Sequence, residues 1–93
     1  MLLVLSSLAG GPKHGYALIQ DISSFTGVEL GPGSLYGCLA RLERRGLVQR
    51  LAAEDRRHPY RLTAAGERVL RERLELARHL AEIGLRRLET GAV

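Results

Sequence analysis

The chain of 93 residues has little of several residue types that define whole classes of protein. It contains one cysteine, Cys38, and no tryptophan, so an intramolecular disulfide and a cysteine-based zinc site are both excluded. No apolar run approaches the roughly 20 residues needed to cross a bilayer, and we expect a cytoplasmic chain with no membrane partner. The three histidines lie in three separate stretches without the spacing of metal ligands, at His14, His58 and His79.

Catalytic chemistry has equally little support in the sequence. A chain of this length fits one small domain, in which we expect no substrate pocket and no oxyanion site. We therefore predict that the chain is not an enzyme and needs no cofactor. A domain of this size is also marginally stable alone, which favours oligomerisation on physical grounds.

Positive charge is confined to one third of the chain. The formal net charge is +4 at pH 7. Residues 31–62 carry seven arginines against three acidic residues, whereas residues 1–30 and 63–93 are nearly balanced. An excess held in one segment predicts a face that binds a polyanion.

Residues 31–48, GPGSLYGCLARLERRGLV, predict a short amphipathic helix. Pro32 suits its first turn, and Ser34 is the expected N-cap. From Leu35, leucines recur at i, i+4 and i+7 and give one apolar face. The other face carries Ser34, Tyr36, Arg41, Arg44 and Arg45. Such a helix suits the major groove of DNA, and it equally suits an ordinary solvated surface, so this segment alone leaves both interpretations open.

Two helices are expected before this segment. Residues 1–8 are mostly apolar and predict a short, largely buried helix that ends before a Gly-Gly-Pro turn. Residues 14–25 predict a second helix, which Thr26 and Gly27 end. Its apolar members at helical spacing are Tyr16, Ala17, Ile19, Ile22 and Phe25.

A hairpin and a long helix are expected after it. Partial alternation over residues 47–52 and 58–62 predicts two strands joined by a charged, basic turn. Thr63 is a good N-cap for a last helix that runs to about Leu88. The order helix, helix, helix, hairpin, long helix predicts a mainly α (α+β) fold, a winged helix-turn-helix over residues 1–62 followed by a C-terminal dimerisation helix over residues 63–93.

The last helix carries an apolar stripe with heptad spacing, which is typical of a helix that pairs with another. Charges of both signs share its remaining face, so we do not expect it to bind a polyanion. The alternative is that the stripe packs back onto its own domain. The predicted dimerisation residues are Leu70, Leu74, Ala77, Leu80, Ala81 and Leu88.

Four short motifs, spread over roughly residues 2–70, resemble those of the PadR-like winged-helix transcriptional regulators. They are His14-Gly15-Tyr16 with Leu18, Gly33-Ser34-Leu35-Tyr36, Arg41-Leu42-Glu43 with Gly46-Leu47-Val48, and Tyr60-Arg61-Leu62-Thr63 with Gly66. The sequence departs from the family pattern at Gly37, where proline is common, and at Arg57-His58-Pro59 in the wing. It is similar to the members with a short C-terminal region.

The resemblance implies that Tyr36 lies at a DNA-binding face and contacts phosphate, and the alternative is a half-buried ring beneath the wing. For Ser34, a phosphate contact and plain helix capping both remain open. Arg41 is placed to reach a base edge, whereas Tyr16 is expected mainly in the core. The candidate DNA-binding residues are Lys13, His14, Tyr16, Ser34, Tyr36, Gly37, Arg41, Arg44, Arg56 and Arg57.

These observations predict a homodimeric, sequence-specific DNA-binding regulator, most simply a repressor on a palindromic operator in double-stranded DNA. The alternative is a winged-helix module whose basic face binds an acidic partner protein. An unidentified small-molecule effector bound between the long helices is a further expectation, and the sequence does not name it.

Overall fold

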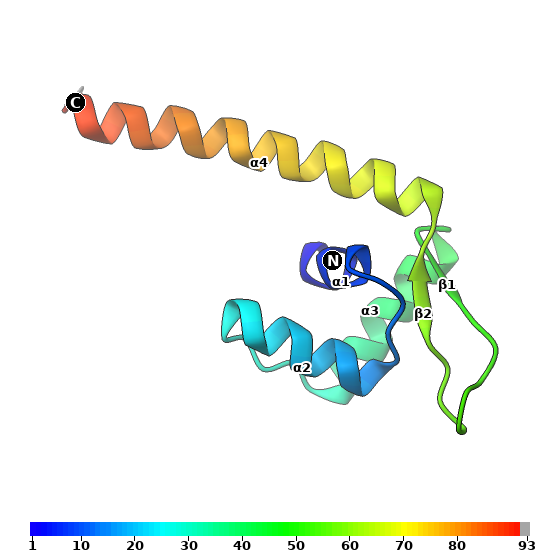
Figure 1. Cartoon of the computed structure of the whole chain (residues 1–93). Helices are drawn as coiled ribbons and strands as arrows, with labels where there is room; N and C mark the ends of the chain where they lie inside the picture. The colour runs from blue at the N-terminus through cyan, green and yellow to red at the C-terminus, as the bar shows by residue number, and fades with distance from the viewer. Residues whose placement is uncertain (92–93) are drawn as a thin grey trace.

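The computed structural model describes residues 1–91, and its elements follow the predicted order (Figure 1). They are α1 (Leu2–Ala9), α2 (Gly15–Thr26), α3 (Pro32–Arg44), β1 (Val48–Arg50), β2 (Tyr60–Leu62) and α4 (Ala64–Thr90). The fold is the predicted winged helix-turn-helix with a long last helix. No helix in residues 1–91 is both long enough and apolar enough to cross a membrane.

The sheet is a short antiparallel hairpin with one additional bridge. Val48 pairs with Leu62, and Arg50 pairs with Tyr60. Lys13, between α1 and α2, exchanges two backbone hydrogen bonds with Tyr60, at 3.1 and 2.9 Å. Both strands are shorter than predicted. Leu47 is buried in the turn before β1, and β2 begins after Pro59, which has no N–H to donate to the sheet.

The hairpin narrows to a tight turn at its tip. Glu54 and Arg57 exchange backbone hydrogen bonds of 2.7 and 2.9 Å. The two residues between them, Asp55 and Arg56, have φ angles of 49° and 67°. Positive φ at both central positions is the geometry of a type I′ turn, whose twist matches that of paired strands.

A single core joins all the elements, and it confirms the predicted apolar faces of α1 and α3. Its buried members are Val4, Leu5, Leu8, Leu18, Ile22, Leu35, Leu39, Leu42, Leu47, Val48, Tyr60 and Leu70. The expected core role of Tyr16 is wrong, because its side chain is 62% exposed. The inward face of α2 is instead formed by Gly15, Leu18 and Ile22, so Tyr16 lies a quarter turn or more outside it.

The expected N-cap of α3 is also wrong. Gly31 occupies the N-cap position with extended backbone, Pro32 begins the helix, and no side chain caps it. Ser34 therefore lies inside the first turn, exposed on the outer face. The physical reason is that Pro32 fits the first helical position, which moves the cap to the residue before it.

The start of α4 is fastened to the end of α3 by backbone contacts. The Thr63 side chain accepts a 3.0 Å hydrogen bond from the Gly66 amide, which confirms the predicted cap, and its hydroxyl donates to the Gly46 carbonyl at 2.7 Å. A Cβ on Gly66 would lie only 2.0 Å from the Leu47 carbonyl oxygen. The absence of a side chain at Gly66 is what allows α4 to approach the turn before β1.

Only the first turns of α4 belong to the core, and the rest projects from it (Figure 1). Leu70 is 4% exposed because it packs in its own domain, and its predicted place in a dimer seam stays a prediction. Residues 71–90 are exposed, except for half-buried Ile83. The radius of gyration is 15.8 Å, against about 12 Å for a compact chain of this length.

Substituting Gly66 tests the close approach of α4. Gly66→Ala should lower the free energy of unfolding by roughly 2–3 kcal/mol, because a carbonyl oxygen, unlike a flexible side chain, has no room to move aside. Chemical denaturation measures this change. Gly37→Ala is the matched control: its Cβ would meet only the Arg41 side chain, at 3.5 Å, so it should raise stability by up to about 1 kcal/mol. An unchanged Gly66→Ala protein would contradict the contact.

Candidate nucleic-acid interface

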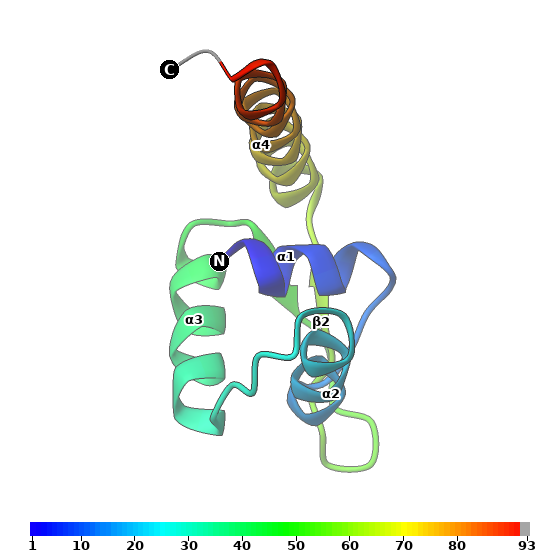
Figure 2. The ribbon, with the colours of Figure 1, turned by 90° about the vertical axis from the view of Figure 1, so that its left-hand side faces the viewer.

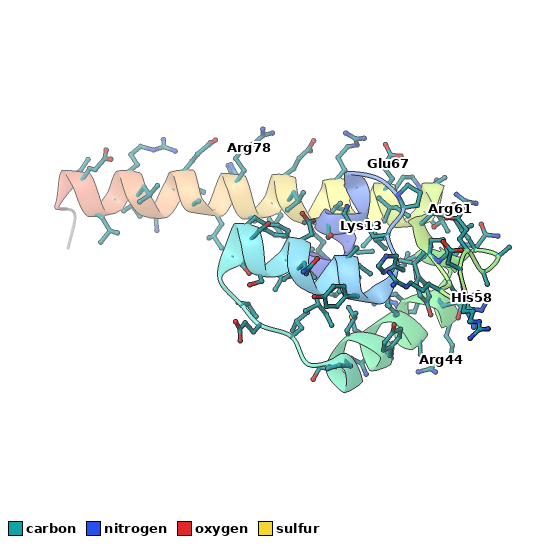
Figure 3. All side chains as sticks on the ribbon, turned by 60° about the horizontal axis from the view of Figure 1, so that its bottom comes forward. Lys13, Arg44, His58, Arg61, Glu67 and Arg78 are labelled. Carbon is teal, nitrogen blue, oxygen red and sulfur yellow. The ribbon has the colours of Figure 1, made fainter. Side chains whose placement is uncertain are left out.

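The outer face of α3 is polar and exposed along its length. Ser34, Arg41 and Arg44 are exposed on it, and Tyr36 is 50% exposed. Figure 3 shows Arg44 pointing away from the body near the end of the helix. This face has the shape and chemistry of a helix that enters the major groove, while the leucines behind it are buried in the core.

The first turn of α2 meets α3 where Tyr36 crosses Gly15. A Cβ on Gly15 would lie 2.2 Å from the Tyr36 hydroxyl oxygen and 2.6 Å from the adjacent ring carbon. The Tyr36 ring therefore lies directly on the Gly15 backbone, and its hydroxyl reaches the helix N-terminus. Tyr36 is thus half-buried, with its ring against the start of α2, and its predicted phosphate contact stays a prediction.

His14 is the N-cap of α2, and its ring connects that helix to the hairpin. Its Nδ1 accepts a 3.4 Å hydrogen bond from the Ala17 amide. Its Nε2 lies 3.3 Å from an Nη atom of Arg57, which belongs to the hairpin. The free amides and the dipole at the start of α2 favour an anion here.

The hairpin supplies the cations on the other side of the α2 N-terminus. Arg56 and Arg57 are exposed at its tip, as predicted. His58 is held lower down, where its Nδ1 lies 2.9 Å from the Leu51 carbonyl oxygen. Figure 3 shows His58 within the hairpin and Arg61 higher on the same element.

These elements enclose a cleft of about 350 Å³. It is lined by His14, Gly15, Tyr16, Tyr36, Arg50, Arg56, Arg57, His58 and Tyr60. Nine non-glycine side chains were predicted on the DNA face, and five of them line this cleft. Ser34, Arg41 and Arg44 are exposed on α3 outside the cleft lining. The cleft gathers arginine, histidine and tyrosine, and no carboxylate lines it.

Lys13 is turned away from this surface, and the structure corrects its predicted role. Its ammonium group donates to the carbonyl oxygens of Ser7 and Gly11 and lies 3.9 Å from a carboxylate oxygen of Asp21. The Ser7 hydroxyl donates to the same carboxylate. Carbonyls at the end of α1 attract a cation, so Lys13 stabilises the junction of α1 and α2.

Besides Gly15, the sequence-based prediction missed three side chains that line the cleft: Arg50, His58 and Tyr60. Arg50 lies directly opposite Tyr60 in the hairpin, and residues directly opposite in an antiparallel pair share one face of the sheet. The signal was present in the strand alternation, but using it requires the register of the hairpin, which the sequence does not fix.

Comparison with known proteins agrees with this architecture. A family model described as the transcriptional regulator PadR-like family matches residues 4–72, from α1 to the first turns of α4. The chain belongs to the PadR-like family. Because this family consists of transcriptional regulators, its membership agrees with the prediction that the chain is not an enzyme.

Two relatives and a solved structure show how far the similarity of this PadR-like chain extends. It is 51% identical over 78 residues to an uncharacterized 37.1 kDa transposon protein of Streptomyces fradiae, covering 83% of this chain but only 23% of that protein. It is 39% identical over 74 residues to a transcriptional regulator of Mycobacterium tuberculosis, covering 76% of this chain and 68% of the regulator. A PadR family transcription regulator of Clostridium difficile has the same fold, with a TM-score of 0.84 at 22% identity over 94% of this chain and 95% of that one.

The contact between Gly15 and Tyr36 can be tested by a double-mutant cycle. Gly15→Ala should lower the free energy of unfolding by roughly 1 kcal/mol, because the Tyr36 ring must swing aside. In a Tyr36→Ala background the same substitution should be neutral or slightly stabilising, since alanine is the better helix former. Chemical denaturation of the four proteins gives the coupling. Equal effects of Gly15→Ala in both backgrounds would show that the ring does not lie on Gly15.

Proposed function

We propose that this PadR-like chain is a homodimeric, sequence-specific DNA-binding repressor that acts in the cytoplasm on a palindromic operator. The observation that carries the proposal is the convergence of α3, the α2 N-terminus and the hairpin on one basic surface. In this arrangement α3 enters the major groove, and the hairpin contacts the backbone beside it. The dimer represses by occupying its operator.

Within that surface, different residues have different tasks. Arg41, exposed at the beginning of the last turn of α3, suits a bidentate contact with a guanine edge. Arg56 and Arg57 at the hairpin tip suit phosphate contacts, which position a protein without selecting sequence. Arg44 lies in the last turn of α3, where a cation also complements the helix dipole, so we assign it to the DNA backbone.

The projecting part of α4 supports the dimer. It leaves large apolar side chains in water, with Leu74 45%, Leu80 67% and Leu88 79% exposed. A helix of this kind gains its stability from packing rather than from its own propensity. In Figures 1 and 2, α4 lies on one side of α1, with α2 and the hairpin tip on the other, so pairing through α4 leaves the basic surface free.

A groove beside α4 continues the same apolar surface. It has a volume of about 780 Å³ and lies between the end of α1, β2 and α4. Leu8, Leu70 and Leu74 form part of its wall, and acidic and basic side chains of α4 alternate along its rim. Alternating charges are self-complementary across a two-fold axis, and therefore a second copy of this chain is the partner we propose.

Binding to DNA should weaken steeply with salt. The logarithm of the association constant should fall linearly with the logarithm of salt concentration, because arginine–phosphate contacts release counterions. Arg56→Ala and Arg57→Ala should each reduce that slope by about 1. Mobility shifts with duplexes selected from a random pool, or with the DNA upstream of the gene, measure it.

Arg86→Ala is the matched control for the salt series. Arg86 is an exposed arginine on the distal part of α4, away from the proposed surface, so its removal should leave the slope unchanged. A folded wild-type dimer that does not bind DNA, or binds it independently of salt, would reject the proposed function.

The dimer can be tested by placing carboxylates on the exposed apolar stripe of α4. Leu74→Glu combined with Leu80→Glu should give a folded monomer by light scattering, because buried unpaired charges are costly at an interface. His79→Glu, on the opposite side of the helix, should leave the mass unchanged. A double variant that stays dimeric would place the interface elsewhere.

A further inference from the structure

The cleft between α2, α3 and the hairpin is lined by a tyrosine whose hydroxyl has no partner within residues 1–91. Tyr60 lines the cleft and is only 9% exposed. Its hydroxyl makes no hydrogen bond with any residue in 1–91. Within that range every fully buried side-chain nitrogen or oxygen has a hydrogen-bond partner, so the Tyr60 hydroxyl is not fully buried. The Tyr60 oxygen must therefore keep a small area open to the outside, and the cleft provides that opening.

Most polar groups of nearly buried residues are hydrogen-bonded, so the unpaired hydroxyl that opens into the cleft indicates a partner from outside the chain. Burial raises the pKa of Tyr60 above its ordinary value of 10.0; the neighbouring Arg50 opposes the shift, and the charges of Glu43 and Tyr36 add to it. The hydroxyl consequently keeps its proton near neutral pH and is available as a donor.

The surroundings of this hydroxyl select the chemistry of that partner. Arg50, Arg56 and Arg57 line the cleft from the hairpin, and His14 lines it from the start of α2. The α2 N-terminus adds its free amides and its dipole. Donors therefore approach from several elements and directions, which suits an anion with several acceptor oxygens.

We propose that the cleft is a site for a phosphate group, with the Tyr60 hydroxyl as one of its donors. The volume of about 350 Å³ is larger than one phosphate needs, so it also admits the group to which the phosphate is attached. Two sources share this chemistry: a phosphodiester of the DNA backbone and a free phosphate. The first source rests on the DNA binding proposed above, and the second does not.

Tyr60→Phe tests the site, because it removes one oxygen and keeps the ring. The variant should be as stable as the wild type, since the hydroxyl has no partner in the chain. Its Kd for DNA should rise about tenfold, with the salt slope unchanged because no charge is lost. Ser24→Ala removes a hydroxyl that bonds the Asp21 carbonyl, outside the cleft lining, and should leave Kd unchanged.

Two further measurements identify the source of the phosphate. In the first, one phosphodiester at a time is replaced by a neutral methylphosphonate. If a phosphodiester fills the cleft, one such replacement should weaken DNA binding by the wild type, and Tyr60→Phe should bind that modified duplex no more weakly than the wild type does. Titration with inorganic phosphate, against chloride at equal ionic strength, should give binding by the wild type that is weaker in Tyr60→Phe if the cleft accepts the free anion.

Either result supports the site and names its source. The proposed site would be overturned if the wild type and Tyr60→Phe had equal affinity for DNA and equal binding of phosphate. A clear loss of stability in Tyr60→Phe would also overturn it, because the hydroxyl would then have a structural role. If the folded wild type binds no DNA, the proposed function fails, and the phosphate titration alone decides this inference.

Discussion

The close approach of Gly66 to the Leu47 carbonyl is the contact on which the rest of the architecture depends. It joins the end of α3, the first strand and the start of α4 at one point, and Thr63 bonds to both sides of it. Backbone groups make most of this junction, and they have far fewer alternative arrangements than long side chains. The direction in which α4 leaves the domain is therefore fixed relative to α3.

That junction also keeps two surfaces of different chemistry apart. Arginines outnumber carboxylates around the cleft and along α3, whereas α4 alternates charges and exposes leucine. α1 lies between them in both views, with its apolar residues in the core (Figures 1 and 2). A protein that pairs through one surface and binds a polyanion through the other needs such a separation, because each partner then approaches without displacing the other.

Periodicity and capping residues were sufficient to predict the order of the elements and the start of α4 at Thr63. The sequence did not predict which apolar residues of a helix the rest of the domain buries, because that depends on tertiary contacts. Tyr16 fits the apolar period of α2, but Leu18 and Ile22 fill the core. Leu70 fits the heptad of α4, yet its own domain buries it.

The cleft depends on tertiary contacts even more strongly. Lys13 is close in sequence to the candidate anion site, and the carbonyls at the end of α1 draw it inward. Arg50 and Tyr60 become neighbours only through the hairpin register, and a shift of one residue would place them on opposite faces. Composition therefore indicated which third of the chain is basic, while the pairing of strands determined which of its residues meet.

The turn at Asp55 and Arg56 has a consequence for any attempt to improve this protein. Both residues have positive φ, a conformation that asparagine and glycine adopt more easily than other residues, and an Asn-Gly pair is the usual choice in such a turn. Selection for heat resistance alone would thus favour replacing Arg56 with glycine and would remove a cation from the tip. A thermostable variant obtained in that way would have less backbone strain in the turn and one positive charge fewer on its basic surface.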